Sequence, residues 1–385
     1  MTIFIIARGT PTKKEPQWGC FEFDQAKALA ALGHKVVYLS VDSRFRLYFR
    51  KIGTSKFITN DVHTYNSFLL PHVIAKLGGE KFAYQLRIWQ LEKLYLKAVH
   101  EVGKPDILYT HYLFCTYEST FLRNKYNIPL VAIEHWSDLQ KENLSEHILK
   151  MAGSYQYADK VIAVSQSLQK TLYKRFGINA CVVNNMVGDV FSYERSMSFS
   201  VLNFVTTGSL IHRKGYDLLI QAFAKAQLPN EQWHLNIIGS GEEKSHLQQQ
   251  IDQNNLQDNI TLAGQKSKEE IVAIYQQSDI FVLPSRSETF GVVYIEAMAC
   301  GLPVIATPCG GPEEFVTDKD GLLVPVDNVE KLAEAIKYMF HHYQEYDRKA
   351  IADNCQARFS SKVIAKQLTR IFEDVLAKHH IITIN

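Results

Sequence analysis

The sequence predicts an α/β protein built from two Rossmann-like, doubly wound domains. Three observations lead to this fold class. Short β-branched runs alternate with longer amphipathic stretches along the whole chain, which is typical of βαβ units whose parallel sheets are covered on both faces. The 385 residues exceed the usual size of one hydrophobic core. The alternation stops once, in the polar stretch from Gly188 to Ser200, which we interpret as a linker.

The first half is expected to contribute one sheet with its covering helices. The expected strands are Ile3–Ala7, Lys35–Ser40, Ile107–His111, Leu130–His135, Lys160–Ser165 and Ala180–Asn184. The expected helices, from their apolar periodicity, include Gly19–Leu32, Lys81–Val102 and Gln166–Phe176.

The second half repeats the same rhythm and is expected to form the second sheet. Its expected strands are Leu202–Thr207, His234–Gly239, Ile260–Ala263, Ile280–Pro284, Pro303–Thr307 and Gly321–Pro325. We therefore expect an N-terminal domain of residues 1–190, a C-terminal domain of residues 191–360, and a helix in residues 361–385 that packs back on the first domain. Because open α/β sheets bind ligands beyond the carboxyl ends of their strands, a cleft between the two domains is the expected site.

Composition and charge exclude several classes of protein. The net charge of +2 is far from the basic balance of a nucleic-acid binder, although residues 1–190 carry 24 Lys and Arg against 16 Asp and Glu. The six cysteines form no CxxC pair, so neither a disulfide framework nor a zinc site is indicated. No apolar run has the length of a signal-peptide core or of a membrane span, and we expect a cytoplasmic protein.

The stretch from Phe281 to Gly310 carries the clearest indication of chemistry. Glu288 lies in a polar turn, Gly291 opens an apolar helix, and Glu296 follows Glu288 by eight positions. Eight residues of helix span about 12 Å, so two carboxylates at this spacing can hold hydroxyl groups at both ends of a nucleotide sugar. The N–H groups of the helix start would face the diphosphate between them. Glu296 has apolar neighbours, and we expect it to be buried with a partner.

This segment resembles the E-x7-E signature of the retaining glycosyltransferases of family 4, which have the GT-B fold. The continuation AMACGLPVIATPCGG, the later DGLLVP and the upstream GSLIHRKGYDLLIQAF and IIGSGEE also resemble that family. The similarity is strong over residues 158–326 and weaker but continuous from Gly19 to His135. It implies a metal-independent hexosyltransferase that uses a nucleoside diphosphate sugar and needs no cofactor.

The resemblance also implies roles for individual residues. Glu288 would lie near the donor sugar, Glu296 at the ribose hydroxyls, and Lys214 at the diphosphate. Ser209 stands where the family often has an arginine, and Arg213 is the candidate to replace that charge. The remaining candidate donor-binding residues are Gly19, Gly208, Ser209, Gly239, Gly241, Phe290, Gly291, Val292 and Val293.

Two histidines end successive strands of the first half. His135 matches the family histidine beside the donor sugar, and His111, at the end of the preceding strand, is assigned to the acceptor or sugar side. Glu134 alternates to the other face of its strand and is interpreted as structural.

Catalysis in such a transferase would rest on electrostatic stabilisation of the leaving diphosphate, which takes the proton of the acceptor. The spacing of Asp318 and Asp320 matches a D-x-D metal motif, but the pair precedes Gly321 in a predicted turn and is interpreted as loop structure. No Walker A, HExxH or G-x-S-x-G pattern is present in the sequence. The family resemblance implies a UDP-sugar as the first candidate donor and a GDP-sugar as the second.

The acceptor is left open as a saccharide or a lipid-linked saccharide, as in the synthesis of surface polysaccharide or glycolipid. A cluster of cations and aromatic residues, with Arg44, Arg46, Arg50 and Lys51, is consistent with either an anionic membrane surface or a solvated helix. Two alternative functions also stay open. One is a nucleotide-sugar epimerase of the same fold, and the other is an inactive scaffold that binds nucleotide sugars.

Overall fold

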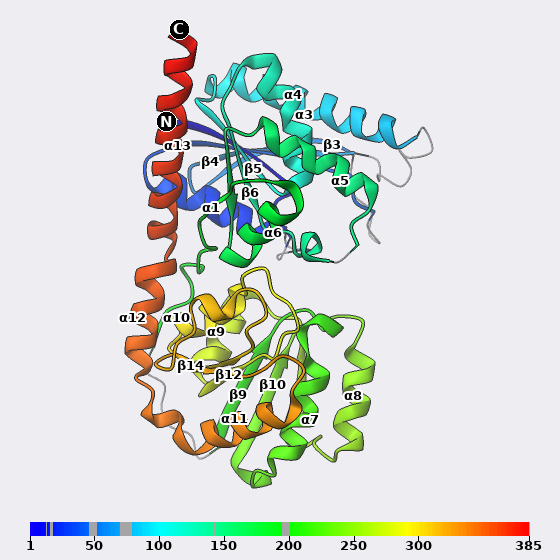
Figure 1. The fold of residues 1–385 in the computed structure, drawn as a ribbon, viewed down its shortest axis with the longest axis vertical. Helices are drawn as coiled ribbons and strands as arrows, with labels where there is room; N and C mark the ends of the chain where they lie inside the picture. Colours follow the sequence, from blue (N-terminus) through cyan, green and yellow to red (C-terminus); the bar gives the residue numbers. More distant parts are fainter. Residues whose placement is uncertain are drawn as a thin grey trace. The chain divides into compact units, whose positions relative to one another are not determined.

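The computed structural model describes residues 1–12, 14–15, 18–45, 52–69, 79–141, 143–194 and 201–384. The chain divides into two compact units. The N-terminal unit consists of Met1–Val164, Leu168–Asn184 and Ser361–Asn385, and the C-terminal unit consists of Ser165–Ser167 and Asn185–Ser360. Each unit contains one sheet with helices packed on it, so the expected α/β fold class is confirmed (Figure 1).

The sheet of the N-terminal unit has the order β3-β4-β2-β1-β5-β6-β7-β8 over the described residues. Its strands are β1 Thr2–Ala7, β2 Lys35–Asp42, β3 Gly53–Thr59, β4 Val62–Phe68, β5 Ile107–His111, β6 Leu130–Glu134, β7 Lys160–Ala163 and β8 Cys181–Val182. Neighbouring strands are parallel except for β3, which is antiparallel to β4. The central strands are buried on both faces, which explains why β1 is apolar in nearly every position.

The hairpin of β3 and β4 is missing from the strands expected on the sequence. All seven residues of β3 are exposed, so its sequence lacks the alternation that marks a half-buried strand. Asn60 and Asp61 connect the two strands with φ angles of 49° and 60°. Positive φ at both central residues is typical of the type I′ turn of a tight hairpin.

The sheet of the C-terminal unit has the order β11-β10-β9-β12-β13-β14, and all of its pairs are parallel. The strands are β9 Leu202–Thr207, β10 Trp233–Ile238, β11 Ile260–Gly264, β12 Ile280–Val282, β13 Val304–Ala306 and β14 Gly321–Leu323. Each expected strand of this half is present, with ends that differ by a few residues. The carboxyl ends of β9, β10 and β12 carry the loops that contain most of the candidate site residues.

Helices flank both sheets (Figure 1). In the N-terminal unit they are α1 Cys20–Ala31, α3 Glu80–Val102, α4 Leu113–Tyr126, α5 Glu146–Ala152, α6 Gln166–Phe176, whose first residues count to the other unit, and α13 Ser361–Ile384. In the C-terminal unit they are α7 Tyr216–Ala226, α8 Lys244–Gln253, α9 Lys268–Gln276, α10 Val292–Ala299, α11 Val329–His342 and α12 Arg348–Phe359. The final helix α13 lies beside α1. Its Thr369 hydrogen-bonds His34, in the turn after α1, and its Phe372 packs on Tyr109 of β5.

Candidate functional site

A buried ion pair joins two loops of the C-terminal unit. Lys214 ends the short 3-10 helix His212–Lys214 after β9, and Glu288 lies in the loop between β12 and α10. The Nζ atom of Lys214 lies 2.6 Å from Oε1 of Glu288, and the two residues are 8% and 5% exposed. Neither residue is therefore an ordinary surface residue.

Two further groups hold the Glu288 carboxylate. Arg213 places Nη1 3.3 Å from Oε2 and donates a 2.6 Å hydrogen bond to the carbonyl of Ser287. The hydroxyl of Ser285 donates to Oε1 at 2.7 Å. Burial alone would raise the pKa of Glu288, but the charges of Lys214 and Arg213 outweigh it and hold the pKa below its ordinary value of 4.5. Glu288 is therefore a carboxylate at neutral pH.

The two loops are fixed to each other by contacts that sequence reasoning missed. Arg286 donates two parallel bonds to the carboxylate of Asp217, at 2.8 and 2.7 Å, and its backbone N–H donates to the carbonyl of Arg213. Gly215 packs so tightly on Pro284 that a Cβ atom there would lie 2.2 Å from the Pro284 carbonyl oxygen. Arg286 belongs to the polar turn after β12, but nothing in the sequence indicates that it pairs with Asp217, which lies 69 positions earlier. These contacts fix the cations beside the carboxylate.

The geometry of the E-x7-E segment differs from the helical span expected for it. Helix α10 begins only at Val292, so Glu288 lies in the turn before the helix and only the second half of the eight-residue interval is helical. Gly291 caps the helix with φ 92°, a left-handed value that a residue with a side chain adopts at a cost. The first N–H groups of α10 have no partner inside the helix, as in every α-helix, and can receive an anion.

Glu296 lies one turn further along α10 and is 8% exposed, as its apolar neighbours predicted. The two residues that precede it in the helix, Tyr294 and Ile295, are also buried. Burial raises the pKa of the Tyr275 hydroxyl, and the carboxylate of Glu296 raises it further. Glu288 and Glu296 are thus both buried acids at the carboxyl end of β12, one in the loop and one in the helix.

The glycines after β9 and β10 are required by close packing of two loops. A Cβ atom on Gly239 would lie 1.8 Å from the carbonyl oxygen of Gly208, and one on Gly241 would lie 2.2 Å from that of Leu210. The side chain of Lys214 passes over Gly208, and Ser209 is exposed. The structure thus gives these glycines a packing reason for their identity, whether or not they also contact a donor.

The side chain of Phe290, a candidate donor-binding residue, lies in the apolar core of the C-terminal unit. Its ring is 1% exposed and packs against Phe315 and Phe359 at 5.2 and 5.7 Å between centroids. Only its backbone can face a ligand, because the side chain belongs to the apolar core. Val292 and Val293, which follow it in the first turn of α10, are partly exposed.

The N-terminal unit brings the two candidate histidines together. His111 ends β5 and His135 follows β6, and Nδ1 of His111 lies 3.2 Å from Nε2 of His135 with the rings stacked. His111 is completely buried, whereas His135 is partly exposed. Burial, followed by the neighbouring His135 and Arg8, lowers the pKa of His111 well below 6.5, so this ring is neutral at neutral pH. His111 therefore contacts His135 from a fully buried position, and its assignment to the acceptor or sugar side stays a prediction.

Glu134 has the structural role expected for it. The buried carboxylate accepts hydrogen bonds from the backbone N–H groups of His135 and Trp136 at 2.7 and 2.6 Å, and from the Tyr155 hydroxyl. Burial raises the pKa of Glu134 in spite of these bonds. The residue fixes the turn that presents His135.

Gly19 begins α1 with φ 73°, and a Cβ atom there would lie 2.1 Å from the carbonyl oxygen of Gly9. As for the glycines of the C-terminal unit, this close approach accounts for the residue without a ligand. Asp320, in the D-x-D spacing, accepts bonds from the backbone and hydroxyl of Thr317 and so holds a turn.

Of the four cations considered for a membrane surface, Arg44 is bonded to Asp42, and Arg46, Arg50 and Lys51 lie outside the described residues. Within the described ranges, no helix is both long and apolar enough to cross a bilayer. No group of three or more His, Cys, Asp and Glu residues suited to a metal ion is found there either.

Comparison with protein families assigns both halves of the chain. The family described as "Glycosyl transferases group 1" matches residues 202–356, and "Glycosyltransferase Family 4" matches residues 23–188. An uncharacterised glycosyltransferase of Methanocaldococcus jannaschii is 30% identical over 299 residues, which cover 73% of this chain and 81% of the relative.

Solved structures share the fold. Sucrose-phosphate synthase from Thermosynechococcus elongatus superposes with a TM-score of 0.79 at 21% identity, covering 98% of this chain and all of the other. The Anabaena protein HepE in complex with UDP and glucose gives a TM-score of 0.73 at 20% identity, covering 97% of this chain and all of HepE.

Proposed function

Because the chain belongs to family 4 of the glycosyltransferases, we propose that it transfers a hexosyl group with retention from a nucleoside diphosphate sugar to a saccharide or lipid-linked acceptor. The product would enter surface polysaccharide or glycolipid. The observation that carries this proposal is the buried Lys214–Glu288 pair at the carboxyl ends of β9 and β12, with the partly exposed Arg213 beside it. Two cations fixed beside one carboxylate form a site that is ready for an anion and for sugar hydroxyls.

The proposed chemistry is the stabilisation of a leaving diphosphate. Negative charge develops on the phosphate oxygens as the anomeric C–O bond breaks, and Lys214 and Arg213 are positioned to compensate it. The N-terminus of α10 adds the positive end of a helix dipole. The acceptor hydroxyl bonds to the anomeric carbon on the face that the diphosphate leaves, and its proton goes to a diphosphate oxygen. This scheme requires no metal ion and no cofactor.

The acids and His135 would select and orient the donor. Glu288 would accept hydrogen bonds from sugar hydroxyls through lone pairs that Lys214, Arg213 and Ser285 leave available. Glu296 would accept from the ribose hydroxyls. His135, held by Glu134 and His111, would contact the donor sugar.

We propose UDP as the nucleotide of the donor and GDP as the second candidate. HepE, which shares the fold, has been solved in complex with UDP and glucose, and UDP is therefore the first nucleotide to test.

The experiment that tests the donor site is thermal unfolding with UDP, GDP, ADP, CMP or NAD in the presence of EDTA. A ligand that binds only the folded state adds about 2.7 kcal/mol of stability at one hundred times its Kd. We expect one nucleoside diphosphate to stabilise the protein, Glu296→Ala to lose the effect, and Glu269→Ala, at an exposed position of α9, to keep it. Stabilisation by NAD alone, or by none of the five, would contradict the proposal.

Product analysis separates the alternatives. NMR of the product should show an anomeric configuration equal to that of the donor, with the sugar attached to an acceptor. Conversion of the donor sugar without any acceptor would indicate the epimerase, for which the comparisons give no support. Nucleotide binding without turnover on a broad acceptor panel would indicate the scaffold.

A further inference from the structure

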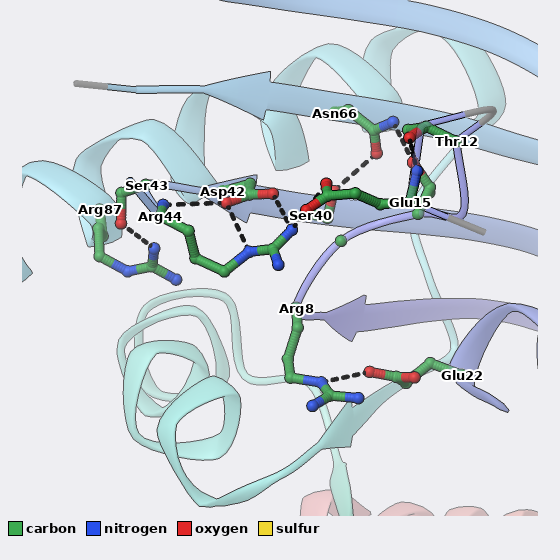
Figure 2. A network of polar contacts seen from close by, with 12 residues as sticks. Arg8, Thr12, Glu15, Glu22, Ser40, Asp42, Ser43, Arg44, Asn66 and Arg87 are labelled. Carbon is green, nitrogen blue, oxygen red and sulfur yellow. Dashed lines mark hydrogen bonds and ion pairs between the residues drawn. The ribbon is translucent and has the colours of Figure 1, made fainter. Parts of the chain in front are cut away.

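A pocket separate from the proposed donor site lies wholly within the N-terminal unit, at the carboxyl ends of β1 and β2. It has a volume of about 180 Å³, and three arginines line it: Arg8 after β1, Arg44 after β2, and Arg87 on α3. Figure 2 shows the three side chains beside these strand ends. The function proposed above assigns no role to any of them.

Arg8 is fixed by contacts on three sides. Its Nε donates to the buried carboxylate of Glu22 at 2.7 Å, and its guanidinium lies over the rings of Tyr112 and Trp18, 3.8 and 4.6 Å from their centroids. Burial disfavours the charge, but Glu22 and Tyr112 outweigh this effect and raise the pKa of Arg8. The structure gives Nη1 and Nη2 no hydrogen-bond acceptor among the described residues. A guanidinium that is clamped in this way presents a preorganised fork.

Arg87 is held in the same manner by α4. Its Nε and Nη2 bond the two oxygens of Glu118, at 2.5 and 3.1 Å, and Nη1 donates to the hydroxyl of Ser43 at 2.6 Å. Three of its five N–H groups are used by these bonds, and the other two have no acceptor among the residues that the structure describes. Arg87 therefore faces the pocket with part of its fork unoccupied.

Arg44 completes the lining from the other side. It bonds both carboxylate oxygens of Asp42, at 3.2 and 3.0 Å, and its guanidinium stacks on Trp18. The indole of Trp18 thus contacts both Arg8 and Arg44.

The hydrogen-bond donors left in the lining suit an anion. Three arginines and two carboxylates, Asp42 and Glu118, line the pocket, and each carboxylate has both oxygens bonded to its own arginine. Two further carboxylates contact these arginines from outside the lining: Glu22 pairs with Arg8, and Glu15 lies 3.6 Å from Arg44. The groups left over are guanidinium N–H donors of Arg8 and Arg87. Such donors match the oxygen pairs of phosphates and carboxylates. The volume is below the roughly 300–1,000 Å³ of pockets for drug-sized ligands, so it suits one small group.

We propose that this pocket binds the acceptor through an anionic group, a phosphate or a carboxylate carried on a sugar. This inference rests on the proposed function, because it names the class of acceptor for that reaction. The pocket, in turn, selects charged saccharides against neutral ones.

The test measures binding without requiring transfer. Calorimetry on the full chain with saturating UDP, which occupies the donor phosphate site, uses inorganic phosphate, glucose 6-phosphate, glucuronate and glucose as probes. The pocket variant is Arg87→Gln with Glu118→Gln, since removing both charges of a buried pair avoids an uncompensated ion. The matched control is Arg123→Gln, at the other end of α4, where the ion pair with Asp159 is partly exposed.

We expect glucose 6-phosphate or glucuronate to bind about tenfold or more tightly than glucose, as one charge-assisted bond predicts. The double variant should lose this preference and Arg123→Gln should keep it. Phosphate and glucuronate together show which anion is preferred. Equal affinity for glucose, no binding by any probe, or an unchanged preference in the double variant would overturn the inference. A failure of the proposed function would give a different result: no nucleotide would bind, whereas the affinities of the four probes for the pocket could still be measured.

Discussion

Replacing Lys214 by methionine isolates the ion pair on which the proposed donor site depends. The side chains of Lys214 and Glu288 are 10% and 6% exposed, and their charged atoms are 2.6 Å apart, so the substitution leaves a buried carboxylate. Breaking a buried pair on one side costs about 3–5 kcal/mol. Because Arg213 and Ser285 still contact Glu288, we expect the lower end, about 3 kcal/mol, or somewhat more than a hundredfold in the unfolding equilibrium.

The loss should depend on pH in a defined direction. In the wild type the pKa of Glu288 is lowered in the folded state, so the ionised carboxylate stabilises the fold above about pH 4.5, and this contribution disappears as the pH falls through the lowered pKa. In Lys214→Met the main charge that lowers this pKa is gone, and Glu288 takes up its proton at a higher pH. The difference between the two proteins should therefore be full at neutral pH and shrink in acid.

Urea unfolding, followed by circular dichroism between pH 7 and pH 4, measures this difference. Lys225→Met is the control, because the Lys225–Glu330 pair is exposed and should contribute little. If Lys214→Met were no more destabilising than Lys225→Met at pH 7, or if its deficit grew in acid, the assignment of a buried, functional pair would be refuted. In an activity assay the same variant should bind UDP weakly and transfer sugar slowly.

Three other changes test separate parts of the structure. Gly291→Ala should cost about 1–2 kcal/mol from its left-handed φ alone and weaken UDP binding, which thermal unfolding with and without UDP will measure. His111→Gln should flatten the decline of stability below about pH 6.5, since the lowered pKa of His111 means that the unfolded chain takes up its proton first; a decline identical to wild type would argue against this. Glu288→Gln should bind UDP more tightly than wild type while transferring more slowly, because Lys214 is released from the carboxylate; calorimetry showing weaker binding would contradict this.

Local pattern was sufficient for most of the fold. The apolar strands and the amphipathic helices such as Gln166–Phe176 appear where the periodicity predicts them, since both depend on burial of one face or of both faces. The burial of Glu296 also followed from its neighbours. The strand β3 was missed because an exposed strand has no apolar alternation, and β4 was missed because several of its buried positions carry polar residues, Thr64, Asn66 and Ser67. The Asn60–Asp61 pair is itself a turn signal.

The site could be predicted in its members but not in its contacts. Lys214 and Glu288 are 74 positions apart, and their approach depends on the order of β9 and β12 in the sheet and on the Arg286–Asp217 bonds. The side chain of Phe290 lies in the core, where it packs on Phe315. The sequence of the loop around Phe290 does not indicate this contact, because Phe315 is 25 positions further along the chain. Sequence identifies chemical types, whereas tertiary packing decides which of them meet.

The charge balance of the donor site gives a reason for placing a carboxylate among its cations. Arg213 and Lys214 are consecutive in the chain and contact the same carboxylate, so the buried charge of Lys214 and the partly exposed charge of Arg213 repel each other in the absence of ligand. Glu288 compensates one of them and leaves a net charge of about +1, which still attracts a diphosphate but does not match it fully. A diphosphate that has gained charge through bond cleavage then interacts with the cations more strongly than the intact donor does, which is the condition for catalysis rather than for mere binding. The same carboxylate weakens the hold on the nucleoside diphosphate product and so favours its release.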